Sequence, residues 1–228
     1  MKLSIIGYGK MGKAIERLAP QYGFYNTVII DNEEDWTEKQ GALKDCVAAI
    51  EFSTPQSVLS NLSKCFELQI PVISGTTGWG DKKEDFLKLW HNKPVSFIYG
   101  SNFSIGANIF FKLNKYLAQQ MKLQAQYAVS IEETHHIHKK DAPSGTALTI
   151  EKDILSQLDN QTNIPIISYR EGEVVGEHLV NYKSGEDIIQ IKHCAFNRDL
   201  FAHGALKAVV WLLKHPGIYA FEDIFDVL

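Results

Sequence analysis

Long apolar runs, cysteine pairs and blocks of like charge are all missing from this sequence. A membrane-spanning helix needs about 18 consecutive apolar residues, and the first apolar stretch breaks at a glycine after residue 6, which is too early even for a secretory signal. We therefore expect no membrane association. The three cysteines are odd in number and show no C-x-x-C spacing, which favours a reducing compartment, and we expect the cytoplasm.

Basic residues are also scarce. The 23 Lys and Arg stand against 27 Asp and Glu, for a formal net charge of −4. Proteins that bind nucleic acid mainly through phosphates are usually basic, so we expect no nucleic-acid partner. The 228 residues are 45% hydrophobic and 22% charged, which is ordinary for a globular protein of one large domain or two small ones.

Two patterns follow each other along the chain. Up to about Asn102, short apolar runs alternate with helical periodicity, which predicts a mostly parallel α/β sheet covered on both faces. The expected strands are 3–6, 28–30, 47–52, 72–73 and 95–98, and the expected helices are 11–18, which stops at Pro20, and one opened by Thr54-Pro55. Beyond Asn102, a helix over 109–121 and period-two alternation at 127–131 and 189–193 predict a second domain with a more open sheet. The last helical pattern, 201–212, fits either domain.

A glycine motif follows the first expected strand and opens the first expected helix, which is the context of a dinucleotide-binding turn. It reads Gly7-Tyr8-Gly9-Lys10-Met11-Gly12. In such a turn the first glycine permits the tight bend, the second lets the backbone approach a pyrophosphate, and the third lets helix and strand pack closely. The helix N-terminus then offers free amides to the phosphates. The alternative is a glycine turn without a ligand.

An acidic residue stands where such a motif needs one. Asp31 follows Gly12 by 19 positions, at the end of the second expected strand, where its carboxylate can accept hydrogen bonds from the adenosine ribose. It is followed by Asn32-Glu33-Glu34-Asp35 without an arginine, an unfavourable setting for a 2′-phosphate. We expect NADH to be preferred, with NADPH accepted less well.

Two further loops follow expected strands. Gly75-Thr76-Thr77-Gly78 comes directly after strand 72–73, where its hydroxyls can reach a nicotinamide ribose. The stretch 101–108 lies at the junction of the two patterns, where its polar groups can meet the nicotinamide amide. A simple turn before a helix and a hinge between domains are the respective alternatives.

The stretch 132–147 is the most informative. Between positions 135 and 140 it holds three of the eight histidines and two lysines, and Ser144 then stands as the N-cap of an expected helix. The amides of Gly145 and Thr146, with the Thr146 hydroxyl, would make an anion site at that helix start. Cations beside an anion site suit a substrate bearing carboxylates, and histidine can deliver a proton near neutral pH. The alternatives are a solvated loop and a metal site at His136-x-His138, which the nearby lysines oppose.

These stretches together resemble one enzyme family. The segment from Glu133 to Ala147, reading H-H-x-H-K-x-D-A-P-S-G-T-A from His135, is similar to the signature of the 4-hydroxy-tetrahydrodipicolinate reductases, also called dihydrodipicolinate reductases. Supporting segments occur in the family's order. They are Gly7–Gly12, Glu51-Phe52-Ser53-Thr54-Pro55, Gly75–Gly78 and Ser101–Gly106.

The resemblance implies a two-domain enzyme. A Rossmann-type dinucleotide-binding domain would span 1–103 and 204–228, and a smaller α+β domain with an open mixed sheet, for substrate binding and oligomerisation, would span 104–203. The implied reaction is the NAD(P)H-dependent reduction of 4-hydroxy-tetrahydrodipicolinate to tetrahydrodipicolinate with loss of water, in diaminopimelate and lysine biosynthesis. The implied assembly is a homotetramer, and the substrate is a small dicarboxylate.

Residue roles carry over by position. His135 would be the proton donor or acceptor and Lys139 its catalytic partner. The substrate-binding residues would be His136, Lys139, Gly145, Thr146 and Lys207, where Lys207 replaces a more usual arginine and binds a carboxylate only as a point charge. The cofactor-binding residues would be Gly7, Tyr8, Gly9, Lys10, Met11, Gly12, Asp31, Gly75, Thr76, Thr77, Gly100, Ser101, Asn102 and Phe103. No metal is expected.

Two other functions are compatible with the first domain alone. A related two-domain dehydrogenase for another amino or keto acid would share the glycine turn without needing the segment from His135 to Thr146. A non-catalytic NADH-sensing protein would bind the cofactor without turnover. The presence of His135 and Lys139 favours catalysis, because a sensor needs no proton donor.

Overall fold

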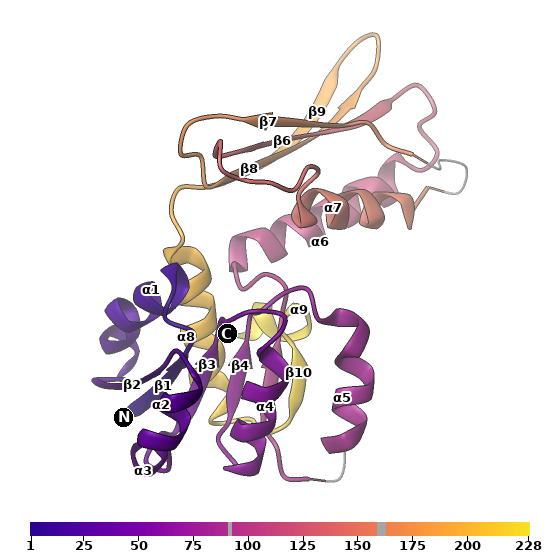
Figure 1. Ribbon diagram of the computed structural model, residues 1–228. Coiled ribbons are helices and arrows are strands. Elements are labelled where there is room, and N and C mark those ends of the chain that lie inside the picture. The colour runs from indigo at the N-terminus through magenta and orange to yellow at the C-terminus, as the bar shows by residue number, and fades with distance from the viewer. Residues whose placement is uncertain (91–92, 159–162) are drawn as a thin grey trace. The chain divides into compact units, whose positions relative to one another are not determined.

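The chain folds into two compact units (Figure 1). The computed structural model describes residues 1–90, 93–158 and 163–228. The first unit comprises Met1–Ile105 and Asp199–Leu228, and the second comprises Gly106–Arg198. The chain therefore returns to the first unit after the second, which assigns the last helical pattern, α8 (Asp199–Leu212), to the first unit.

The described residues of the first unit form a parallel sheet of six strands in the order β10-β5-β4-β3-β1-β2. The strands are β1 (Lys2–Ile6), β2 (Asn26–Ile30), β3 (Ala48–Glu51), β4 (Val72–Ser74), β5 (Phe97–Tyr99) and β10 (Ile218–Ala220). The helices besides α8 are α1 (Lys10–Leu18), α2 (Glu33–Glu38), α3 (Gln40–Leu43), α4 (Val58–Glu67), α5 (Lys83–Trp90) and α9 (Phe221–Ile224), with 3₁₀ turns at Ala19–Tyr22, Gly80–Lys82 and Phe225–Val227.

Both faces of this sheet are buried. Leu3, Ile5 and Ile50 pack with α1, α8 and α9 in one apolar cluster, whereas Ile6 and Val72 pack with the α2–α5 side in another. Strands buried on both faces need nearly continuous apolar sequence, which is the pattern that predicted a parallel sheet. The predicted α/β class with a Rossmann-type sheet is confirmed.

One glycine lets α8 pack closely on this core. A Cβ at Gly204 would lie 1.7 Å from the carbonyl oxygen of Phe103, so no larger residue fits there without moving the backbone. Ala205 and Ala208 on the same helix are fully buried as well. Small residues therefore bring α8 against the sheet.

The described residues of the second unit form a mixed sheet of four strands in the order β7-β6-β8-β9. Strands β6 and β7 are parallel, and the other pairs are antiparallel. The elements are α6 (Ile105–Met121), β6 (Ala128–His135), α7 (Gly145–Leu155), β7 (Ile166–Arg170), β8 (Gly176–Lys183) and β9 (Ile188–Ala195). Both α6 and α7 pack on one face, against Val129, Ile131, Val180 and Tyr182. Alternate residues of β6 are buried, as the period-two pattern predicts.

One local prediction is wrong. The helix expected to open at Thr54-Pro55 begins instead at Val58, after a turn in which Val58 N donates to Thr54 O and the Thr54 and Ser57 hydroxyls are hydrogen-bonded to each other. Thr54 therefore closes a turn within the loop rather than capping the helix. In contrast, the predicted cap at Ser144 is confirmed, because its Oγ accepts a hydrogen bond from Ala147 N at 3.1 Å. The sequence patterns predict none of the strands β7, β8 and β10.

Among the described residues, none forms a helix that is both long and apolar enough to cross a membrane.

Candidate active site

The turn from β1 into α1 exposes the backbone of the glycine motif. Gly7 has a φ of +87°, and a Cβ there would lie 2.2 Å from the Phe52 carbonyl oxygen. A Cβ on Gly12 would lie 2.3 Å from the Gly7 carbonyl oxygen, so both positions need glycine. Gly9 is the N-cap of α1 and offers no side-chain cap, and a Cβ there would meet nothing within 4 Å. Open space therefore faces the helix N-terminus, as a bound anion requires.

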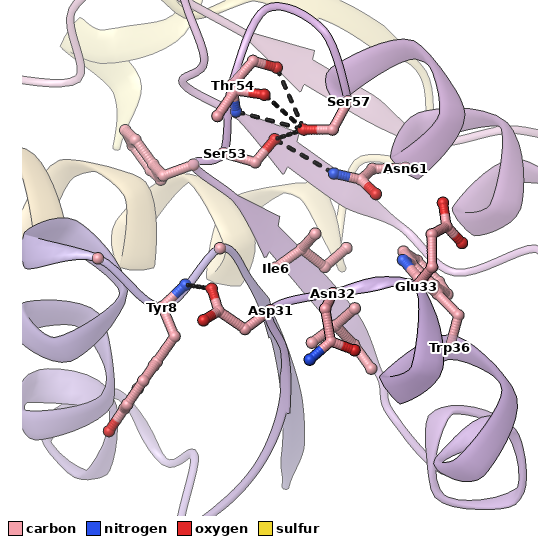
Figure 2. Close-up of a pocket in the computed structure, with 14 residues that line it drawn as sticks. Ile6, Tyr8, Asp31, Asn32, Glu33, Trp36, Ser53, Thr54, Ser57 and Asn61 are labelled. Carbon is pink, nitrogen blue, oxygen red and sulfur yellow. Dashed lines mark hydrogen bonds between the residues drawn. The ribbon is translucent and has the colours of Figure 1, made fainter.

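A cavity of about 380 Å³ lies beside this turn (Figure 2). Its walls include Gly7, Tyr8 and Gly9 of the turn and Asp31 at the end of β2. Asp31 Oδ1 accepts a hydrogen bond from Tyr8 N at 2.7 Å, so the fold brings the two predicted features into contact. Residues outside the prediction complete the cavity: Ile6, Ile30, Asn32, Glu33, Trp36, Phe52, Ser53, Thr54, Ser57 and Asn61.

Carboxylates line this cavity beside the end of β2. Asp31 and Glu33 line it, and neither lysine nor arginine occurs among its described lining residues. Asp31 N donates to Asp35 Oδ2 at 2.8 Å, but Lys39 pairs with Asp35 and Lys64 pairs with Glu33, so the local argument depends on Asp31. A ribose hydroxyl can donate to the Asp31 carboxylate, whereas a phosphate at the same place would meet a like charge.

A buried carboxylate ties together the loops after β3 and β4. Glu51 is fully buried and accepts hydrogen bonds from Ser74 Oγ at 2.6 Å, from Thr76 Oγ1 at 2.9 Å and from Ser53 N at 3.1 Å. Burial raises the pKa of Glu51, although these donors oppose the shift. Glu51 therefore ties the loop after β3 to the loop after β4, and the sequence predicts that the second of these loops holds the cofactor.

A second cavity of about 150 Å³ lies at the ends of β4 and β5. It is lined by Thr76, Thr77, Gly100 and Ser101, which are predicted cofactor residues, and also by Lys83. Gly75 lies against the ring of Phe52, where a Cβ would come within 2.1 Å of a ring carbon. The two loops with predicted nicotinamide contacts therefore share one hollow of the first unit.

The second unit gathers a buried acid–base cluster where β6 ends. Glu133 and His135 lie on its helix-covered face, with His178 on the neighbouring β8, and all three are buried. His135 Nδ1 lies 3.4 Å from Glu133 Oε2, and the rings of His135 and His178 meet edge to face at 5.1 Å. Ser144 Oγ lies 3.2 Å from His178 Nε2, which joins the cap of α7 to the same cluster.

Lys139 is held by ionic contacts in the loop after β6. Its Nζ donates to both carboxylate oxygens of Asp141 at 2.8 Å. Arg170 at the end of β7 supports the loop, because its guanidinium donates to the backbone carbonyls of Lys139 at 3.3 Å and of Asp141 at 2.5 Å. The loop that carries the predicted catalytic lysine is thus anchored from a strand that the sequence did not reveal.

Burial disfavours the charged form of both histidines of the cluster. Burial lowers the pKa of His135, with Lys139 and Arg170 acting in the same direction and Glu133 opposing them. Burial, with the nearby His135, lowers the pKa of His178 to about 4. Burial by itself would raise the pKa of Glu133, but the hydrogen bonds from Ser144 and Ser168 outweigh burial and hold this pKa below its usual value.

The cluster also has the composition of a metal site. One ligand atom from each of Glu133, His135 and His178 lies within 4.8 Å of the others, and such a set can bind a divalent cation. However, the Arg170 guanidinium already lies 3.6 Å from the Glu133 carboxylate. A metal ion would therefore have to displace or tolerate a fixed cation.

Several residues predicted by position lie apart from these features. Phe103 is buried in the core, 4.5 Å from the Phe221 ring between centroids, and it lines neither cavity. Lys207 lies exposed on α8 in the first unit, whereas His136, Gly145 and Thr146 lie in the second. The remaining predicted cofactor residues also line neither cavity; they are Lys10, Met11, Gly12, Gly75 and Asn102.

Four features of the second-unit cluster were not predicted from the sequence. They are the contact of Glu133 with His135, and the presence of Ser168, of Arg170 and of His178. A signal existed only for Glu133. It precedes His135 by two positions in a strand, and therefore shares its face.

Comparisons with known proteins agree over both units. Models of the dihydrodipicolinate reductase N-terminus and C-terminus match residues 1–103 and 106–225. The chain is 38% identical to the 4-hydroxy-tetrahydrodipicolinate reductase of Christiangramia forsetii, with 100% of this chain and 99% of that protein covered. It is 34% identical to the enzyme of that name from Wigglesworthia glossinidia brevipalpis, with 86% and 71% covered.

Solved structures support the fold. A dipicolinate-bound dihydrodipicolinate reductase from Paenisporosarcina sp. TG-14 superposes with a TM-score of 0.73 at 20% identity, covering 100% of this chain and 99% of that one. An aspartate dehydrogenase from Thermotoga maritima superposes with a TM-score of 0.52 at 14% identity, covering 93% of this chain and 96% of that one. The fold alone therefore does not separate the reductase from a related dehydrogenase. The family models and sequence identities do separate them. This chain belongs to the 4-hydroxy-tetrahydrodipicolinate reductase family, oxidoreductases that use a pyridine nucleotide in diaminopimelate and lysine biosynthesis.

Proposed function

We propose that the first unit binds NADH in preference to NADPH and that the second unit binds the cyclic dicarboxylate and supplies its proton. The observation that carries the proposal is the arrangement where β6 ends, where buried His135, the anchored Lys139 and the Ser144-capped start of α7 belong to one unit. A proton donor, a cation and a helix N-terminus together are what a reaction on a dicarboxylate requires.

The cofactor residues fit a dinucleotide. The open N-terminus of α1 suits the pyrophosphate, Asp31 suits a ribose hydroxyl, and Thr76, Thr77 and Ser101 suit the nicotinamide end. When bound, a reduced nicotinamide supplies a hydride for C4 of the substrate ring. We further propose that Gly12 keeps α1 close to β1 and that Phe103 acts from the core beneath Gly100, as its ring lies 3.3 Å from a Cβ built there.

On the substrate side, the proposed chemistry is proton transfer and charge neutralisation. His136, Lys139 and the amides of Gly145 and Thr146 would bind the carboxylates, with Lys207 as a further cation. His135, assisted by Lys139, would give the proton with which the C4 hydroxyl leaves as water while the hydride takes its place. Lys139 would exchange Asp141 for the substrate carboxylate as its partner. We propose no metal in this chemistry, since Lys139 and Arg170 already supply the positive charge.

The cofactor preference yields the first prediction. Replacing Asp31 by alanine should weaken NADH binding about tenfold, the scale of one hydrogen bond to a charged group, and weaken NADPH binding less. The reason is that only the free 2′-hydroxyl of NADH can donate to the lost carboxylate. Dissociation constants for both nucleotides, measured by nucleotide fluorescence, test this. Glu34→Ala, which removes an exposed charge that does not line the cavity, is the matched control. Equal weakening of both nucleotides by Asp31→Ala would refute the assignment.

We also propose that the chain is a cytoplasmic homotetramer that assembles through the second unit. On the sheet face opposite α6 and α7, Ile167 and Tyr169 of β7 are each 47% exposed, and Ile188 of β9 is equally exposed. Apolar residues on an open sheet face suit burial against another copy. Cys46 and Cys65 are buried free thiols in the first-unit core, which suits a reducing compartment.

The assembly prediction uses two isoleucines of equal exposure. Ile167→Glu should lower the mass measured by light scattering from four chains to fewer, because it places a charge in the proposed interface. Ile109→Glu on α6, also 47% exposed, should leave the mass unchanged. A monomeric wild-type protein, or an Ile167→Glu variant that remains tetrameric, would contradict this interface.

The experiment that tests the function is a coupled assay. A purified upstream synthase, pyruvate and aspartate semialdehyde generate the unstable ring, and the loss of NADH absorbance is followed, with NADPH in parallel. Turnover that requires every component is the expected result. Tight NADH binding without turnover would instead favour a sensing protein.

A further inference from the structure

Glu133 is the buried carboxylate of the second unit's cluster, and the proposed function gives it no role in the reaction. It is 1% exposed. Ser144 N donates to both of its oxygens at 3.1 Å, and Ser168 Oγ donates to Oε1 at 2.7 Å. Four donors would satisfy an ionised carboxylate fully. Two ring nitrogens lie near Oε2 besides these donors: His135 Nδ1 at 3.4 Å and, further away, His178 Nε2 at 3.8 Å.

The nitrogen that faces this carboxylate has no other partner. His135 Nδ1 is buried without a hydrogen bond, and Glu133 Oε2 lies 3.4 Å from it. A lone pair turned towards a carboxylate would be repelled, whereas an N–H would be attracted. The geometry therefore favours a proton on Nδ1, in the neutral ring as well as in the charged one.

The opposite nitrogen of the same ring lies beside a glycine. A Cβ built on Gly176 would lie only 3.2 Å from His135 Nε2, so the absence of a side chain at this position keeps that nitrogen uncovered. With Nδ1 committed to Glu133, Nε2 is the atom left to exchange a proton. The ring thus has one nitrogen for orientation and one for chemistry, as in other carboxylate–histidine pairs.

The remaining charged groups around His135 mostly disfavour its protonated form. Lys139 follows it in the loop and Arg170 faces it from β7, and both act with burial to lower its pKa. Glu133 and, more weakly, Asp141 act in the opposite direction. His178, facing from β8, is kept neutral by burial, and His193 of β9 faces His178 rather than His135.

We propose that Glu133 is a positioning residue for the reaction: it holds His135 with the proton on Nδ1 and favours the charged imidazole, so that Nε2 is the proton-exchanging atom. This inference rests on the proposed role of His135. A merely structural role for Glu133, as the acceptor for the Ser144 amide at the start of α7, predicts neither the tautomer, nor the fall in the pKa of His135, nor the shift of the pH profile described below.

The test combines a titration with a pH profile. Imidazole NMR signals of His135, assigned by their loss in His135→Gln, should show the Nδ1–H tautomer in the unmodified protein. In Glu133→Gln the pKa of His135 should fall, because an opposing charge is removed while burial, Lys139 and Arg170 remain. As His135 must be protonated to donate, the alkaline limb of kcat/KM should move to lower pH. kcat at neutral pH should drop roughly tenfold, as expected for a lost orienting carboxylate.

The matched control is the adjacent carboxylate. Glu132 lies on the other face of β6, where its Oε1 accepts a hydrogen bond from Asn181 at 2.9 Å, and Glu132→Gln makes the same chemical change. It should leave the tautomer, the pKa of His135 and the pH profile unaltered. Glu133→Asp, which keeps the charge, should restore part of the shift in pKa.

Each outcome decides the proposal. An Nε2–H tautomer in the unmodified protein overturns it, even if Glu133→Gln does not fold. So does a Glu133→Gln protein that loses turnover with the pKa of His135 and the profile unmoved, since Glu133 would then be structural. The NMR titration does not depend on turnover. If His135→Gln retains normal activity, the proposed function of His135 fails, whatever the tautomer shows.

Discussion

Replacing His135 by glutamine should lower kcat by roughly 10²-fold or more, the usual scale for losing a general acid. Glutamine can occupy much of the space of the imidazole but cannot carry a transferable proton near neutral pH. The exchange removes the 3.4 Å contact between Nδ1 and Glu133, but Glu133 keeps its hydrogen bonds from Ser144 and Ser168. The coupled assay at saturating substrate gives kcat, and thermal unfolding checks that the fold is retained.

A second histidine of the same segment serves as the control for this variant. His138 lies three residues further on with its side chain 72% exposed, and its nearest charged contact is Glu173 at 3.8 Å. His138→Gln should therefore keep kcat within a factor of two or so of the wild type, as for an ordinary surface substitution. Near-normal turnover in His135→Gln would remove His135 from the reaction.

Replacing Lys139 by alanine should also lower kcat by roughly 10²-fold, and it should raise KM in addition. In the proposed function the ammonium both neutralises a substrate carboxylate and assists proton transfer, so its loss should affect binding and the chemical step together. The loop should keep its course, because Arg170 bonds to the backbone carbonyls of Lys139 and Asp141 and not to the lysine side chain. Steady-state kinetics with varied substrate separate the two effects.

The neighbouring lysine is the control for this second variant. Lys140 is exposed and belongs to the same loop, so Lys140→Ala removes an equal charge a single residue away. It should change kcat and KM little. If Lys140→Ala and Lys139→Ala reduced activity equally, the effect would come from the general positive field of the loop, and the specific role of Lys139 would be wrong.

The sequence predicts local structure correctly where residues that are close in the chain are also close in space. The glycine turn between β1 and α1 and the Ser144 cap of α7 involve residues at most five positions apart, so steric limits and capping chemistry predict them. The helix start near Thr54 was misplaced, because two hydroxyls that both resemble caps lie three positions apart. Thr54 and Ser57 bond to each other, and the helix begins after the second.

The contacts between side chains of the candidate site could not be predicted from local sequence. The Ser53 and Thr76 loops meet at Glu51 only because β3 and β4 are adjacent parallel strands, and such pairing joins residues more than twenty positions apart. The same holds for Arg170 and Ser168, which reach Glu133 and the Lys139 loop through the parallel pairing of β7 with β6. Strand order is a long-range property that periodicity does not contain.

The amino-acid pattern alone was therefore sufficient for the family and for the class of fold. It also predicts which residues carry the chemistry, since that prediction depends on spacing within a short segment. The folded arrangement alone decided which carboxylate faces His135, which nitrogen of that ring is left uncovered and what anchors Lys139. Those features depend on strand adjacency and side-chain direction across a sheet, and on the burial that results, which the order of residues in a single segment does not specify.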